Sequence, residues 1–270
     1  MSNDSVNNIP YLMRNGQQYV CLNYHDYGYH IDFEKENFQL LEKPYDNSNK
    51  PFTYQITTIP EFSTTCYTER KVGFEYKGNT EEFTIPMNSQ MLTYFTNYPV
   101  IDYRYQFSIP FSTLTYASLI PQLKKRLEHL HPAKGVEYLM YFVRNAFQFQ
   151  RDTEHFGLEK RFSPEETLVA EKSDCEDRSA LFFALVREIY GLPMIVLSYP
   201  EHVTVAVELD VPAGAGINYK GKIYTLCEPT PQKKELALGE LMPHLRTKNY
   251  EVVLRYDAER KEIITTEASH

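Results

Sequence analysis

The first third of the chain alternates apolar and polar positions in short runs, which is the period of β-strands. Such runs lie at residues 11–14, 18–22, 52–57, 71–76 and 82–85. Tight hairpin turns are predicted at residues 15–16 and 77–80, because Asn and Gly tolerate the positive φ angles that these turns need. No helical period of useful length appears here. We therefore predict a β-rich N-terminal domain over residues 1–112.

After Pro110 the apolar spacing changes to three and four residues, which is typical of amphipathic helices. Helices are predicted at residues 121–127 and 135–149. Another begins at Ser163, because serine caps a helix well and Pro164 suits its first position.

The longest predicted helix follows Ser173 and Asp174, either of which can cap it. Gly191 and then Pro193 end it, since glycine accepts a left-handed backbone and proline cannot continue a helix. Cys175 consequently lies in the first turn of this helix.

Strand-like runs dominate the remainder of the chain, at residues 194–199, 202–209, 222–227, 248–256 and 261–265. Helices that precede consecutive strands in this way favour an α+β fold, with helices packed on an antiparallel sheet. We predict that residues 113–270 form this core as a second domain.

Charge and hydropathy narrow the function classes. The chain has 28 Lys and Arg against 36 Asp and Glu, a formal net charge of −8, which argues against a nucleic-acid partner. No apolar run approaches the ~18–20 residues of a membrane span, so no transmembrane segment is expected. The first residues do not resemble a secretory signal peptide. A mature chain can begin after a removed signal, so an extracytoplasmic origin stays open and the compartment is not determined.

The four cysteines form no Cys-x-x-Cys pair of the kind that indicates zinc or a redox motif. A disulfide between Cys21 and Cys66 and free buried thiols are both compatible with the spacing. Residues 24–30 are rich in Tyr and His, which is more typical of polar surface than of a metal or sugar site. We expect neither a metal nor a cofactor.

Cys175 has the position of a reactive thiol. The free backbone N–H groups and the positive end of the dipole at a helix start favour a thiolate, whereas the neighbouring acidic residues oppose it. A nearby imidazolium must supply the balance. His202 begins a predicted strand, and Glu228 follows the next strand in a position to orient the ring.

This order of nucleophile, histidine and carboxylate resembles the transglutaminase-like superfamily of papain-like cysteine enzymes over about residues 115–232. The run SDCEDRSAL at residues 173–181 resembles the family's Gly-Asp-Cys-x-Asp-x-Ala-x-Leu helix. EHVTVAV at 201–207 resembles its Gly-His-x-x-x-x-Val strand, and GKIYTLCEPT at 221–230 its closing strand, which usually ends Asp-Pro-Thr. The segments RFSPEETL at 161–168 and YGLP at 190–193 resemble those before the nucleophile and after its helix.

The resemblance implies a cysteine peptidase, amidase or acyl transferase with the catalytic triad Cys175, His202 and Glu228. The thiolate attacks a peptide or glutamine carboxamide carbonyl to form a thioester, which water hydrolyses or an amine converts to a cross-link. Peptides or proteins are the implied substrates, with cell-wall peptide among them.

Three departures from the family pattern accompany the resemblance: Glu228 replaces the usual Asp, Val203 stands where many members have Trp, and Ser173 replaces a Gly. The alternative is a catalytically inactive member of the superfamily that binds peptide or glycan without cleaving it.

Overall fold

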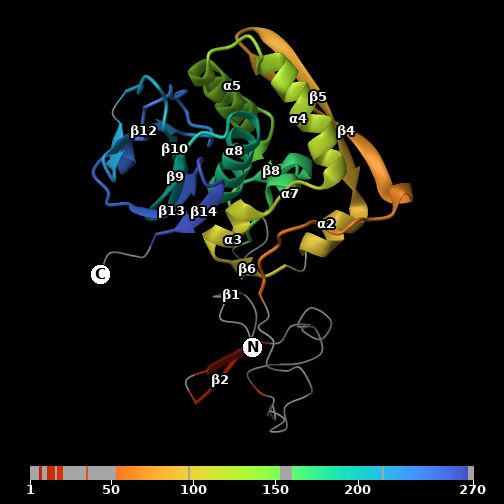
Figure 1. Cartoon of the computed structure of the whole chain (residues 1–270). Helices are drawn as coiled ribbons and strands as arrows, with labels where there is room; N and C mark the ends of the chain where they lie inside the picture. Colours follow the sequence, from red (N-terminus) through yellow and green to blue (C-terminus); the bar gives the residue numbers. More distant parts are fainter. Residues whose placement is uncertain are drawn as a thin grey trace.

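The computed structural model places six antiparallel strands and a group of helices around one long central helix, a mixed α+β fold (Figure 1). The structure describes residues 6–7, 11–15, 17–20, 35, 53–96, 98–152, 160–214 and 216–266. Cys21 and the Tyr- and His-rich residues 24–30 lie outside this part. The α+β layout predicted for the C-terminal half is confirmed.

The main sheet has the strand order β11-β12-β10-β9-β13-β14, and every neighbouring pair is antiparallel. Its strands are β9 (Met194–Tyr199), β10 (His202–Val207), β11 (Ile217–Tyr219), β12 (Lys222–Cys227), β13 (Glu251–Asp257) and β14 (Glu262–Thr265). Strands β9 and β10 are almost entirely buried, because both faces of the sheet are covered. Their apolar side chains divide between two hydrophobic clusters. Of these strands, only the short β11 was not predicted.

Helix α8 (Cys175–Tyr190) packs against β10 on one side and against α5 on the other (Figure 1). The other helices given for the described residues are α2 (Ser89–Thr96), α3 (Tyr103–Ser108), α4 (Thr113–Leu127), α5 (Pro132–Asn145) and α7 (Pro164–Val169). Short 3₁₀ turns cover Thr64–Cys66 and Pro243–Leu245. The middle of α8 is fully buried, so this helix is the centre of the core.

The helix ends follow local sequence chemistry. The Asp174 carboxylate caps α8 and Gly191 ends it with a φ of 60°. Ser163 and Glu166 form a reciprocal capping box at α7. The predicted start of a helix at Pro121 is wrong: α4 begins after Ser112 and continues through this proline.

A long hairpin of β4 (Tyr67–Tyr76) and β5 (Asn79–Asn88) lies on the far side of α4 and α5 from the sheet (Figure 1). Its two-residue turn has positive φ angles at Lys77 and Gly78, as predicted. Phe74 of the hairpin and Phe142 of α5 belong to one hydrophobic cluster, so the core extends across residue 112. The division into domains 1–112 and 113–270 stays a prediction.

Three further two-stranded sheets complete the described elements: β1 (Val6–Asn7) with β6 (Val100–Ile101), β2 (Tyr11–Arg14) with β3 (Gln17–Val20), and β7 (Gln148–Phe149) with β8 (Lys172–Ser173). Two expectations for the first 112 residues are wrong. Helices α2 and α3 occur there, and residues 53–57 form no strand. None of the helices in the described ranges has the length and apolar character needed to cross a bilayer.

Candidate active site

Cys175 lies where α8 begins, beside the start of β10. Strand β12 pairs with β10 only from Val205 onward, so the backbone of Val203 is open on that side. The first turns of α8 occupy this opening. The Ser179 hydroxyl of α8 donates to the Val203 carbonyl at 3.0 Å. The start of α8 is thus held against the residue that directly follows His202.

His202 and Glu228 meet as the sequence predicted. The His202 Nε2 and the Glu228 Oε2 are 2.8 Å apart, and the two residues are only 8% and 2% exposed. The other oxygen, Oε1, accepts the N–H of Thr230 at 2.9 Å. Both carboxylate oxygens are therefore occupied, and the ring is fixed with Nδ1 as its remaining nitrogen.

A buried arginine that sequence reasoning missed supports this pair. Arg144 of α5 donates from Nε and Nη2 to the Glu228 carbonyl and from Nη1 to the Leu236 carbonyl. Its guanidinium fixes the segment that follows β12, including the backbone of Glu228. No local sequence pattern predicts this role, because the carbonyls lie more than eighty residues away along the chain.

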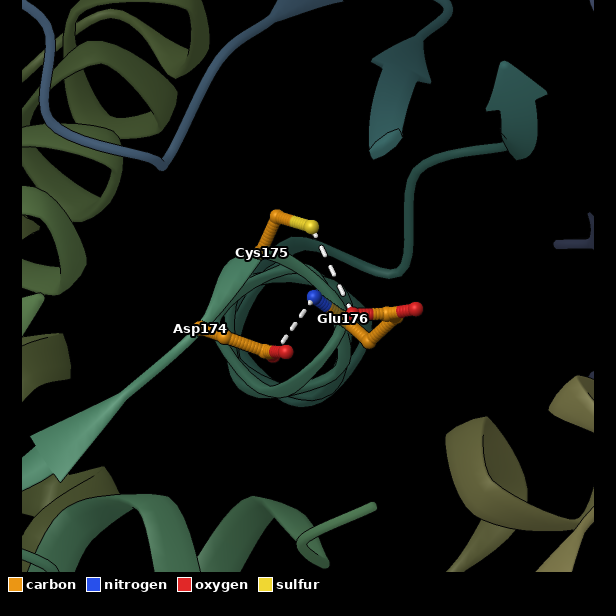
Figure 2. Close-up of side chains that lie close together, drawn as sticks. All are labelled: Asp174, Cys175 and Glu176. Atoms are coloured by element: carbon orange, nitrogen blue, oxygen red, sulfur yellow. Dashed lines mark hydrogen bonds between the residues drawn. The ribbon is translucent and has the colours of Figure 1, made fainter. Parts of the chain in front are cut away.

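The Cys175 thiol is engaged with its own helix start (Figure 2). Its sulfur donates to the Glu176 Oε2 at 3.4 Å, and the Glu176 N–H donates to the Asp174 Oδ1 at 3.1 Å. Within the described residues, no hydrogen bond joins the Cys175 sulfur to the His202 ring. The structure therefore assembles the His202–Glu228 pair and places Cys175 beside β10, with its thiol proton directed to Glu176.

Electrostatics at this helix start keep the thiol neutral. Burial raises the pKa of Cys175 well above its ordinary value, and the negative charges of Glu176 and Asp174 raise it further. The Val203 N–H lowers it by a smaller amount. The helix-start position alone favoured a thiolate, and that effect is outweighed here.

The two acids beside the sulfur differ in proton affinity. Burial and the charges of neighbouring acids raise the pKa of Asp174. Burial also acts to raise the pKa of Glu176, but its hydrogen bond with Asp174 and the charge of Arg161 bring it below the ordinary value. The pKa values of the two acids thus shift in opposite directions, upward for Asp174 and downward for Glu176.

Asp174, Cys175 and Glu176 each offer one potential metal-ligand atom, and these atoms lie within 4.8 Å of one another. Thiolate and carboxylate groups are suitable ligands for a divalent cation. Capping of α8 by Asp174 and the thiol's bond to Glu176 already account for their proximity.

A second buried arginine, also missed from the sequence, supports the nucleophile side. Arg178 donates to the backbone carbonyls of four residues that end α5 or precede α8: Val143, Arg144, Phe147 and Ser173. The buried Asp177 carboxylate accepts the N–H groups of Phe162 and Asp174. These bonds fix the turn that presents Cys175.

The other described cysteines have no part in this arrangement. Cys66 is a free, half-buried thiol, so the disulfide with Cys21 that the sequence left open is not formed. Cys227 is fully buried in the core, as expected from strand alternation with Glu228.

Comparisons with protein-family models, curated proteins and solved structures found no match to this chain.

Proposed function

We propose that this chain is a cysteine-nucleophile amide hydrolase or acyl transferase of the transglutaminase-like type. One observation carries the proposal: the His202 ring is fixed by Glu228 through Nε2, while Ser179 ties the start of α8, where Cys175 lies, to the Val203 carbonyl on the same strand. A cysteine, an imidazole and a carboxylate in this order form the arrangement that activates a thiol for acyl transfer.

In the proposed reaction His202 takes the thiol proton through Nδ1, and the sulfur attacks a peptide or carboxamide carbonyl. The tetrahedral oxyanion accepts a hydrogen bond from the Cys175 N–H, because an N–H at the first helical position has no intrahelical acceptor. His202 then protonates the departing amine as the C–N bond breaks, which leaves a thioester. Water or a second amine attacks the thioester and gives its proton to His202. As the C–S bond breaks, the acid or new amide leaves and His202 returns the proton to sulfur.

Activation must overcome the high pKa of Cys175. Substrate binding that separates the thiol from Glu176 removes the hydrogen bond that now keeps the proton on sulfur. The same displacement frees the sulfur for attack.

Dansylcadaverine incorporation into casein tests acyl transfer to an amine, and ammonia release from glutamine-containing peptides tests hydrolysis. We expect at least one activity in the wild type and its loss in Cys175→Ser. The variant Cys66→Ser is the matched control, because Cys66 is a free thiol far along the chain from the site. Equal activity in Cys175→Ser and wild type contradicts the proposal.

The second candidate function is a non-catalytic module that binds peptide or glycan. The raised pKa of Cys175 favours it, since a permanently neutral thiol is a weak nucleophile. Under this alternative, peptides bind wild type and Cys175→Ser with equal affinity and neither protein turns them over.

A further inference from the structure

A cavity of about 540 Å³ lies at the opposite end of α8 from Cys175. Helix α3 contacts α8, β13 and β14 here, and the turn between the two strands contributes to the lining (Figure 1). Arg187 of α8 lines the cavity twelve residues after Cys175, which corresponds to about 18 Å along a helix. The cavity is thus separate from the candidate active site, and its volume suits a small organic ligand.

The lining is strongly basic for an acidic protein. The lining contains three cations: Arg104 of α3, Arg187 of α8 and Lys261 of the β13–β14 turn. Glu262 is its one carboxylate, so the formal charge of the lining is +2. The whole chain carries −8. Three cations from three separate elements meet here although the surrounding field is acidic, a combination that attracts an anionic ligand.

Both arginines are held in position while keeping N–H donors available. Arg104 Nη2 donates to the Tyr105 hydroxyl at 2.7 Å, and its Nε is buried without a hydrogen-bond partner. Arg187 donates from Nε to Glu188 at 2.8 Å and from Nη1 to the Phe107 carbonyl at 3.3 Å. Charge-assisted hydrogen bonds from the guanidinium groups that line the cavity would hold an anion there.

The rest of the lining suits the organic part of such a ligand. Tyr256 and Ile263 supply aromatic and aliphatic surface, and Gln55 adds an amide donor. We propose that this cavity binds a phosphate monoester, with the phosphate between Arg104, Arg187 and Lys261. A phosphate monoester carries a charge of about −1.5 to −2 at neutral pH, opposite in sign to the lining charge.

Phenyl phosphate is a suitable probe, and isothermal titration calorimetry at pH 7.5 is the measurement. We expect saturable binding of phenyl phosphate, weaker binding of inorganic phosphate, and none of phenol, because the charged group supplies most of the attraction. Benzoate is the comparison ligand that carries a carboxylate instead of a phosphate. Tighter binding of benzoate than of phenyl phosphate overturns the assignment of a phosphate monoester.

Two charge variants locate the site. Lys261 has a positive φ of 55°, so Lys261→Asn removes the charge with a residue that tolerates this backbone. We expect this variant and Arg104→Gln each to weaken binding about tenfold. Lys125→Asn, on an exposed face of α4, is the matched control and should bind like wild type.

A third variant has the opposite expected sign. Glu188 competes for the Arg187 guanidinium, so Glu188→Gln should tighten the binding of phenyl phosphate several-fold. Absence of saturable binding in wild type up to about 10 mM probe, which corresponds to less than ~3 kcal/mol of binding free energy, overturns the proposal. So does an affinity that Lys261→Asn leaves unchanged, and this exposed substitution does not depend on the folding of the Arg104 variant.

Discussion

The two halves of the candidate active site are built in opposite ways. On the sheet, His202 and Glu228 form a buried pair in which both carboxylate oxygens have donors. At the helix start, Asp174, Cys175 and Glu176 crowd two acids against a thiol, and the pKa of the thiol rises. Ring orientation is therefore built into the sheet, whereas reactivity of the sulfur depends on the charges of the helix start.

Each half has its own buried arginine, and replacing these gives the largest expected effects. Arg178→Met leaves the carbonyls at the end of α5 and the start of α8 without donors, and we expect a loss of about 4 kcal/mol in unfolding free energy. Arg144→Met leaves two carbonyls, those of Glu228 and Leu236, without their arginine donors. We therefore expect a loss of about 2 kcal/mol in unfolding free energy. Urea unfolding at pH 7 measures both. The reverse order of stability would show that the Glu228 side, not the helix start, carries more of the fold.

We expect the stability of the fold to depend on pH through an acid that packs near α8. Burial raises the pKa of Glu166, in α7 against α8, to about 7. Because the folded pKa exceeds the ordinary value of 4.5, its stabilising contribution is complete below pH 4.5 and is lost as the pH rises through 7. The maximum change is about 3 kcal/mol.

Glu166→Gln removes this titration while its amide oxygen can still accept the Ser163 N–H. The variant should therefore gain stability relative to wild type between pH 5 and pH 8. Urea unfolding of both proteins at the two pH values measures the difference. Parallel pH profiles for the two proteins would place the titration elsewhere.

Activity should be sensitive to the orienting carboxylate. Glu228→Gln keeps an acceptor for the Thr230 N–H but presents an uncharged amide to His202, so the charged acceptor that orients the ring is lost. We expect a fall of about 100-fold in kcat/KM for casein labelling. Glu208→Gln, which alters only an exposed pair with Lys222, is the control and should be neutral. Unchanged activity in Glu228→Gln would remove Glu228 from the mechanism.

The smallest expected effect concerns Glu176. Glu176→Gln removes the charge that accepts the thiol proton, so the pKa of Cys175 should fall. Thiolate absorbance near 240 nm, followed against pH and corrected with Cys175→Ser, measures this shift. A pKa that stays constant or rises means that burial alone keeps the thiol neutral.

Local patterns predicted the elements whose ends and periods are determined by neighbouring residues. The caps of α8, the capping serine of α7 and the tight turn at Lys77 and Gly78 follow from side-chain chemistry within a few positions. Pro121 misled the prediction of α4, because proline usually marks the first helical turn and packing against β5 holds this one inside the helix. Tertiary packing overrides propensity at such positions.

The candidate site was predictable only in part for the same reason. Strand order brought His202 to Glu228, and helix capping placed Cys175. The burial that raises the pKa of Cys175, and the distant carbonyls that hold Arg144 and Arg178, arise only when segments far apart in sequence meet. No local spacing encodes them.

Iodoacetamide alkylation of Cys175 between pH 5 and pH 9 tests most directly whether His202 activates this sulfur. Glu176→Gln first releases the thiol from Glu176, and the comparison protein carries His202→Gln in addition, whose amide can still donate to Glu228; Cys66 in the same sample is the reference thiol. We predict that the protein with His202 reacts at least about tenfold faster than the double variant at pH 6.5, because the imidazole can then take the thiol proton. Superimposable rate profiles for Cys175 in the two proteins would contradict the account.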